Sequence, residues 1–144
     1  MKNINGLIIS ESKRFIKDDG DIFHGIRKTD IGYADFGEIY FSFIKNNSIK
    51  GWKMHTEMTL NIIVPIGSIL FNFIDLREKS ESYQTQIKLL LGDDNYKRVT
   101  IPPRIIFAFK GMGMGTNMLA NITNMPHDDA ECQNLELNKY SFIE

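Results

Sequence analysis

Residues 50–75 decide the fold, and they read KGWKMHTEMTLNIIVPIGSILFNFID. Behind Gly51 the chain alternates between apolar and polar side chains, and a Pro-Ile-Gly turn at 65–67 leads into a second, largely apolar run. Alternation with a period of two is typical of a β-strand. The segment therefore predicts consecutive β-strands joined by a tight glycine turn.

A second segment, residues 92–109, reads GDDNYKRVTIPPRIIFAF and repeats this organisation: a glycine-acid turn, a strand, a Pro-Pro pair and a further apolar strand. Short runs of β-branched and aromatic residues recur along the whole chain between Gly, Asn, Asp and Pro clusters, and helical periodicity is nearly absent. The expected strands are Leu7–Ser10, Ile22–Lys28, Glu38–Lys45, Lys50–His55, Thr59–Pro65, Ser68–Asp75, Tyr83–Leu91, Lys97–Ile101, Ile105–Lys110, Thr116–Ile122 and Tyr140–Phe142. This number of short strands predicts an all-β jelly roll or a related double-sheet barrel, as one domain over residues 1–144.

Composition excludes several classes of function. The 144 residues carry a formal net charge of −1, with Lys and Arg scattered, so we expect no nucleic-acid partner and no membrane partner. The apolar runs are too short to span a bilayer, and the first residues contain no signal-peptide stretch. The single cysteine, Cys132, excludes an intrachain disulfide and indicates a cytoplasmic location.

The strand after Gly51 is the candidate site. A period of two places Lys53, His55 and Glu57 on one face and Trp52 with Met54 on the other. If the first face lines the barrel, the three polar groups perturb one another's pKa values and form a candidate catalytic set. The alternative places the same three residues on the solvent face of an edge strand.

In order and spacing, the chain from Gly20 to Asp128 resembles the dTDP-4-dehydrorhamnose 3,5-epimerase family of cupins. The fragments that carry the resemblance are Gly20–Asp21, Glu38–Ser42, Ile49–Trp52, Ile74–Ser80, Leu91–Tyr96, Ile101–Pro103, Asn121–Asn124 and Pro126–Asp128. The resemblance implies a cupin-type jelly-roll β-barrel (a double-stranded β-helix), a homodimer, and a nucleotide-linked 4-keto-6-deoxyhexose as substrate. It also implies proton transfer by a His base and a Tyr acid, without a cofactor.

Several family residues are replaced in this chain. The family stretch Arg-Gly-Leu-His-x-Gln falls on residues 50–55, so Lys50 stands for the phosphate-contacting arginine and Lys53 for the catalytic histidine. The family's tyrosine has no counterpart around residues 120–125, and a later histidine position is Phe107. Cupins that bind a metal use several histidines and a glutamate, whereas this stretch offers one imidazole and a lysine. We therefore predict no metal site.

The remaining candidates come from neighbouring strands. His55 lies on the predicted face of Lys53, and a desolvated lysine there could act as a base or form a Schiff base. Trp52 is a candidate for stacking on the ligand, or else a core residue, and Arg27 is a candidate phosphate contact, or else part of a dimer arm. Tyr40 is a candidate substitute acid, or else a packing residue. Phe107 and Asn121 complete the predicted substrate-binding set with Lys50.

Two functions from different classes follow. The first is a cytoplasmic, metal-free epimerase or isomerase of a dTDP- or other nucleotide-linked 4-keto-6-deoxyhexose in surface-glycan biosynthesis, with Lys53, His55 and Glu57 as its catalytic residues. The second is a catalytically inactive sugar-nucleotide-binding cupin or partner subunit. Loss of the family's base and acid favours the second, because each general acid or base contributes about 10²–10⁴ in rate.

Overall fold

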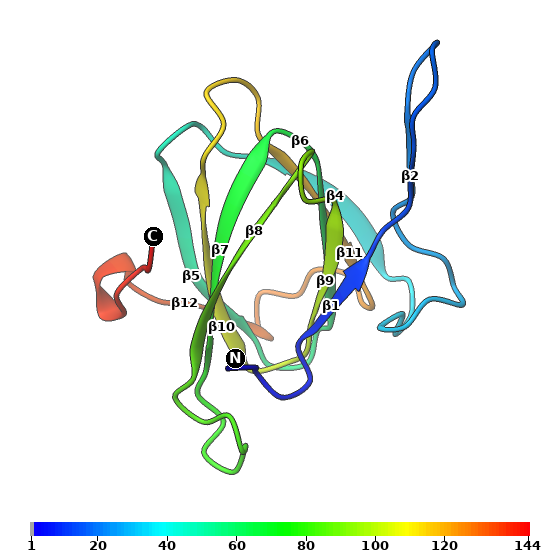
Figure 1. Cartoon of the computed structure of the whole chain (residues 1–144). Helices are drawn as coiled ribbons and strands as arrows, with labels where there is room; N and C mark the ends of the chain where they lie inside the picture. Colours follow the sequence, from blue (N-terminus) through cyan, green and yellow to red (C-terminus); the bar gives the residue numbers. More distant parts are fainter. Residues whose placement is uncertain (1) are drawn as a thin grey trace.

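A computed structural model describes residues 2–144, and its framework is two antiparallel five-stranded sheets that face each other (Figure 1). The first sheet contains, in spatial order, β1 (Ile8–Glu11), β9 (Lys97–Ile101), β6 (Leu60–Ile66), β11 (Met118–Thr123) and β4 (Glu38–Phe43). The second contains β12 (Cys132–Asn134), β5 (Ile49–His55), β10 (Ile105–Gly111), β7 (Ser68–Asp75) and β8 (Gln86–Gly92). This arrangement confirms the predicted all-β, double-sheet barrel.

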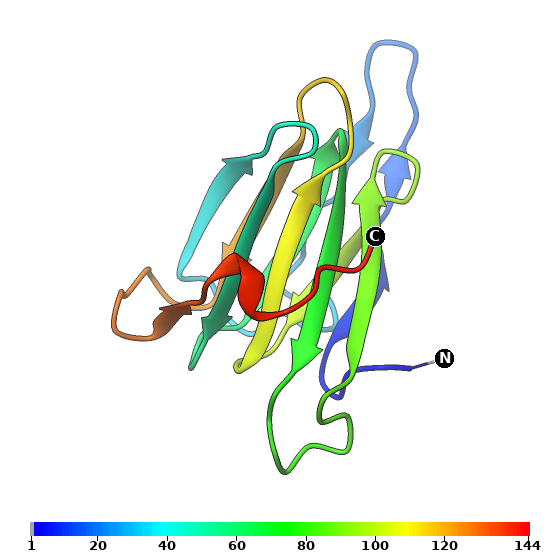
Figure 2. The ribbon, with the colours of Figure 1, turned by 90° about the vertical axis from the view of Figure 1, so that its left-hand side faces the viewer.

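Two segments lie outside the sheets. A hairpin of β2 (Arg14–Phe15) and β3 (Ile22–Phe23) projects from the body as an arm (Figure 1). After the short 3₁₀ helix η1 (Leu137–Lys139), the C-terminal segment crosses the outer face of the second sheet (Figure 2). It is held there by Asn72, whose side chain exchanges two hydrogen bonds of 2.9 and 2.8 Å with the backbone of Ile143.

The core fills the space between the sheets. Phe71, Phe73, Val64, Val99 and Leu91 are fully buried there, and they lie at alternating positions of their strands. Each such side chain stabilises the fold by about 1.5–3 kcal/mol relative to exposure. A second, smaller cluster around Trp52 lies on the outer face of the second sheet and is covered by the C-terminal segment, including Tyr140 and Phe142.

A bulge in β5 sets the geometry of the site. Lys53 pairs with Phe107 of β10 and Gly51 pairs with Ala108, so one extra residue is inserted between them. Gly51 has φ +133, and a Cβ there would lie 2.5 Å from the Cβ of Ala108. Because of the inserted residue, Lys50 and Lys53 lie on the same inner face although they are three positions apart.

Most expected strands are present with ends shifted by a few residues. Two expectations are wrong: the strand expected at 22–28 is only two residues long, because the chain turns away along the first sheet, and residues 140–142 form no strand. The two-residue strand β2 and the strand β12 were not expected. No helix in residues 2–144 combines the length and the apolar character needed to cross a membrane.

Candidate functional site

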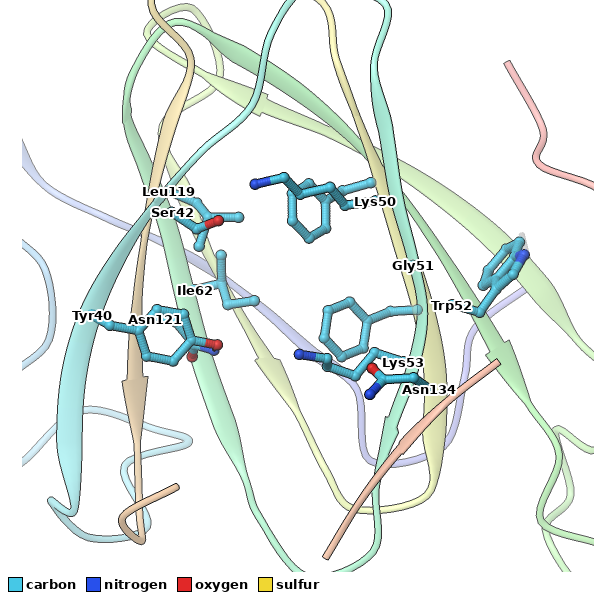
Figure 3. Close-up of a pocket in the computed structure, with 12 residues that line it drawn as sticks. Tyr40, Ser42, Lys50, Gly51, Trp52, Lys53, Ile62, Leu119, Asn121 and Asn134 are labelled. Carbon is cyan, nitrogen blue, oxygen red and sulfur yellow. The ribbon is translucent and has the colours of Figure 1, made fainter. Parts of the chain in front are cut away.

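A cavity of about 360 Å³ opens between the two sheets, with β4 and β11 on one side and β5 and β12 on the other (Figure 3). Its lining consists of Tyr40, Ser42, Lys50, Gly51, Trp52, Lys53, Ile62, Phe107, Phe109, Leu119, Asn121 and Asn134. None of these residues is an aspartate or a glutamate. The cavity therefore combines polar walls, two cations and an apolar back, as expected of a ligand site.

The first wall carries a tyrosine–asparagine pair. Tyr40 and Asn121 are direct partners in the β4–β11 register, and the Asn121 amide donates a 2.7 Å hydrogen bond to the Tyr40 hydroxyl oxygen. Because that oxygen accepts, its own proton is free to be donated into the cavity. Burial raises the pKa of Tyr40 above 10.0, with the Glu38 carboxylate adding to the shift and the Asn121 hydrogen bond opposing it. The phenol therefore stays protonated at neutral pH.

The opposite wall carries the cations. Figure 3 shows Lys53 extending from β5 towards the side of Tyr40, next to Asn134 of β12. Lys50 reaches across the cavity mouth, where its Nζ donates a 2.6 Å hydrogen bond to the carbonyl of Phe43 on β4. Within residues 2–144 neither ammonium group forms an ion pair with a carboxylate. The positive charge of this wall is thus not balanced by an ion pair among the described residues.

The back of the cavity is apolar. Phe107 and Phe109 of β10 form it together with Ile62 and Leu119 from the first sheet. Trp52 lines the cavity, but its ring points away from it (Figure 3) and its Nε1 donates to the carbonyl of Leu137 at 3.1 Å. The ring of Trp52 is therefore a core residue of the outer cluster, as the second of the two interpretations expected.

His55 lies beside the cavity rather than in its lining. Its ring is 6% exposed and stacks on Phe107, with ring centroids 6.4 Å apart. Nδ1 is hydrogen-bonded to Oε1 of the buried Glu131, whose Oε2 accepts from the backbone N–H groups of Glu57 and Met58. Nε2 is buried and has no hydrogen-bond partner among the described residues. A carboxylate on Nδ1 places the ring proton there and leaves the Nε2 lone pair free.

The carboxylate of this pair is ionised. Burial raises the pKa of Glu131, but the hydrogen bonds from His55 and from the two backbone N–H groups lower it more, so the pKa lies below 4.5. Sequence reasoning missed Glu131. It lies 76 positions from His55, in a polar run without a local motif, and the β12–β5 pairing brings the two together.

Of the other predicted site residues, five line the cavity and two lie outside it. The structure places Lys50, Lys53, Tyr40, Phe107 and Asn121 in the cavity lining.

Two predicted residues lie elsewhere. The expected alignment of Glu57 with Lys53 and His55 is wrong, because β5 ends at His55 and the side chain of Glu57 is exposed beyond it. Arg27 lies on the outer side of the first sheet, exposed and paired with Asp30 at 3.0 Å. In residues 2–144 no three His, Cys, Asp or Glu side chains gather as a metal site would require. The absence of a bound metal stays a prediction.

Comparison with known proteins gives a family. No protein-family model matches the sequence, and no curated protein matches it. Among solved structures, the dTDP sugar isomerase of Desulfovibrio desulfuricans G20 is 32% identical, with a TM-score of 0.91 over 94% of this chain and 87% of that one. The dTDP-4-dehydrorhamnose 3,5-epimerase of Bacillus anthracis str. Ames, solved with TDP and PPi bound, is 17% identical, with a TM-score of 0.84 over 96% and 83%. The dTDP-6-deoxy-D-glucose-3,5-epimerase of Legionella pneumophila, in complex with dTDP-4-keto-L-rhamnose, is 16% identical, with a TM-score of 0.83 over 95% and 76%.

Proposed function

The chain belongs to the dTDP-4-dehydrorhamnose 3,5-epimerase family of cupins, and from this premise we propose that it is an isomerase or epimerase of a dTDP-linked 4-keto-6-deoxyhexose, active in glycan biosynthesis. One observation carries the proposal. Two lysines without carboxylate partners among residues 2–144 face a protonated tyrosine across a cavity whose described lining contains no acidic side chain. Such a cavity suits a ligand with a charged diphosphate and a reacting carbonyl.

The diphosphate would lie at the mouth of the cavity, beside Lys50. Among the described residues, the Lys50 ammonium group donates to the backbone carbonyl of Phe43 alone. A phosphate oxygen can replace this carbonyl as the acceptor. A lysine contacts phosphate as a point charge, so binding here is less directional than with an arginine.

The chemistry would be proton transfer next to the ketone. The carbonyl acidifies the neighbouring C–H, a base removes that proton, and an acid returns a proton to the resulting enolate. Tyr40 is the proposed acid, because its oxygen accepts from Asn121 and its proton faces the cavity. Lys53 on the opposite wall would stabilise the negative charge of the enolate. A base or a Schiff-base nucleophile must be an uncharged amine, whereas stabilising an enolate uses the charged ammonium group. We therefore assign Lys53 the stabilising role.

The proposed base is Nε2 of His55. The Glu131 carboxylate on Nδ1 orients the ring and fixes the tautomer that leaves Nε2 unprotonated, as in other carboxylate–histidine pairs. The His55 ring lies beside Phe107, so the base function requires the Phe107 side chain to move aside or the ligand to reach past it.

The test is proton exchange followed by proton NMR in D₂O with dTDP-4-keto-6-deoxyglucose. We expect loss of the proton signal at carbon 3 or carbon 5 of the sugar, at a rate proportional to the protein concentration. His55→Gln should abolish exchange while dTDP still binds, and Lys45→Ala, at an exposed lysine outside the cavity, should exchange normally. No exchange with the wild-type protein would contradict the enzymatic proposal.

A second candidate is a sugar-nucleotide-binding protein without catalysis. The observation that favours it is the place of His55, whose free Nε2 is buried beside the cavity rather than in its lining. In that case dTDP would bind with the same dependence on Lys50 and Lys53, but no proton of the sugar would exchange.

We further propose that the protein acts as a homodimer in the cytoplasm. β4 is an edge strand of the first sheet, and its outward side chains Ile39, Phe41 and Phe43 are 46%, 58% and 57% exposed. The projecting arm exposes Phe15 and Ile16 as well. Apolar groups on an unpaired edge favour association with a second copy. Sedimentation equilibrium should show a dimer that the Phe41→Ser/Phe43→Ser double variant dissociates, and a wild-type monomer would contradict this.

A further inference from the structure

A second, smaller cavity of about 120 Å³ lies on the other face of the first sheet. Its floor is β1 and β9, which Figure 1 shows beside the base of the arm, and segment 24–31 contributes to its walls. Val99 of β9 faces the core between the sheets, so its neighbour Arg98 points to this outer side. The two cavities are therefore on opposite sides of one sheet.

Two buried polar atoms at the floor of this cavity, Nε of Arg98 and Oγ of Ser10, have no hydrogen-bond partner among the described residues. Arg98 and Ser10 are direct partners in the β1–β9 register, so their side chains lie next to each other on one face. Arg98 is only 2% exposed and its Nη2 donates to the carbonyl of Ile31 at 2.6 Å, but its buried Nε has no acceptor among the described residues. The buried hydroxyl oxygen of Ser10 has no partner there either.

On the same face of the sheet, the neighbouring polar pair Thr100 and Asn61 has its hydrogen bonds completed. The Thr100 hydroxyl donates to the side-chain oxygen Oδ1 of Asn61 at 2.6 Å, and Nδ2 of Asn61 donates to the backbone carbonyl of Gly32 at 3.0 Å. The chain at Ile31 and Gly32 thus accepts from Arg98 Nη2 and from Asn61, but it supplies no acceptor to Arg98 Nε and no partner to the Ser10 hydroxyl. Buried donors without acceptors are unfavourable, and charged ones more so, and this favours an acceptor from outside the chain.

The charges around the cavity favour an anion. Asp30 is paired with Arg27, and Glu11 is paired with Lys97 at 3.1 Å, so both lining carboxylates already have cationic partners. Lys13 lines the cavity and forms no ion pair with a described carboxylate. Arg98 and Lys13 therefore form no ion pair with a described carboxylate, and Arg98 interacts with the Asp30 carboxylate only at longer range.

We propose that this cavity binds a small oxyanion, a phosphate or carboxylate group, held by the Arg98 guanidinium, the Ser10 hydroxyl and the Lys13 ammonium group. A buried guanidinium offers its donors in a planar fork that matches two oxygens of such a group, and a hydroxyl beside it can donate to the same group. The site goes beyond the proposed function and does not depend on it, since none of its residues lines the cavity between the sheets.

Isothermal titration calorimetry with inorganic phosphate, at constant ionic strength in sodium chloride, tests the proposal. The protein should carry Lys50→Ala and Lys53→Ala, so that phosphate cannot bind through the first cavity. In this background Ser10→Ala should weaken phosphate binding about tenfold, because a hydrogen bond to a charged group contributes about 1.5–3 kcal/mol. Arg98→Lys should weaken it further, and Lys17→Ala, at an exposed lysine of the arm outside this cavity, should leave it unchanged.

Because Arg98 is buried, its variant can fail to fold; Ser10→Ala and Lys13→Ala then decide the outcome. A parallel titration with acetate identifies the oxyanion class: tighter binding of phosphate indicates a phosphate group, and tighter binding of acetate indicates a carboxylate. Either result supports the site when it depends on Ser10. Phosphate and acetate heats no greater than those of chloride, or equal binding by Ser10→Ala and its parent, would overturn the proposal.

Discussion

The Asn121 amide donates a 2.7 Å hydrogen bond to the Tyr40 hydroxyl from the directly opposite position of the neighbouring strand. Because both residues belong to regular strands of one sheet, their separation is set by the sheet and not by a mobile loop. The hydrogen bond fixes the direction of the phenol and leaves its proton for the cavity. We therefore propose Asn121 as a positioning residue for Tyr40.

Replacing Tyr40 with phenylalanine should abolish proton return without unfolding the protein. The ring still fills its place, but the acid is lost, so turnover of the keto-sugar should fall by about 10²–10⁴-fold with the KM nearly unchanged. Kinetics and the melting temperature measure the two effects. Tyr83→Phe, at an exposed tyrosine outside the cavity, is the matched control. Unchanged turnover in Tyr40→Phe would rule this tyrosine out as the acid.

The two lysines should control affinity for dTDP. Lys50→Met removes the charge at the mouth of the cavity, and we expect dTDP to bind about tenfold more weakly, with a smaller dependence on salt. Calorimetric titrations at low and high salt measure both effects. Lys45→Met removes a charge outside the cavity, and its affinity should equal that of the wild type. Equal losses in the two variants would indicate a general effect of net charge rather than a diphosphate site.

Lys53 should separate binding from catalysis. If it stabilises the enolate, Lys53→Met should lower kcat more than it raises KM, whereas Lys53→Arg, which keeps the charge, should retain part of the activity. Steady-state kinetics distinguish the two parameters. A Lys53→Met variant with normal kcat and raised KM would show instead that this lysine binds ground-state substrate.

Glu131 should make stability depend on pH in the acid range. Its folded-state pKa lies below 4.5, so its contribution is complete above the unfolded-state value and is lost as the pH falls through the folded-state value. Glu131→Gln should lower the free energy of unfolding at pH 7 by about 1.5–3 kcal/mol, because the hydrogen bonds from His55 and from two backbone N–H groups lose their charged acceptor. The difference from wild type should shrink towards pH 3.

Urea unfolding at pH 7 and pH 3 measures this difference. The exposed Glu136 provides the control, and Glu136→Gln should match the wild type at both pH values. A deficit of Glu131→Gln that is equally large at pH 3 would show that the carboxylate charge is not what stabilises the fold.

Gly51 should tolerate no side chain. In Gly51→Ala, the new Cβ meets Ala108 at 2.5 Å and the backbone keeps a φ of +133, so we expect a loss of stability and of dTDP affinity. Gly20 is a close control: its φ is +138, and nothing lies within 4 Å of its added Cβ. Gly20→Ala therefore measures backbone strain alone, about 1–3 kcal/mol. Equal melting temperatures for the two variants would show that the contact with Ala108 does not matter.

Much of the site follows from local pattern. Alternation in residues 50–55 is a property of neighbouring side chains, so it predicts correctly that Lys53 and His55 share the inner face of a strand. The same reasoning fails at Glu57, because alternation does not reveal where a strand ends. Alternation alone would also place Lys50 on the outer face with Trp52. It lies on the inner face because of the bulge at Gly51, which depends on the pairing with β10.

By itself, the sequence determined the all-β class, the approximate strand positions and the family resemblance, because turn residues and two-residue periodicity act over a few positions of the chain. Only the tertiary structure decided that Glu131 meets His55, that the C-terminal segment covers the ring of Trp52, and that Ser10 lies beside Arg98. The physical reason is that these contacts join residues 76 or more positions apart. They depend on strand register and on bulges, which arise when the sheets pair and pack and have no signature in the neighbouring residues.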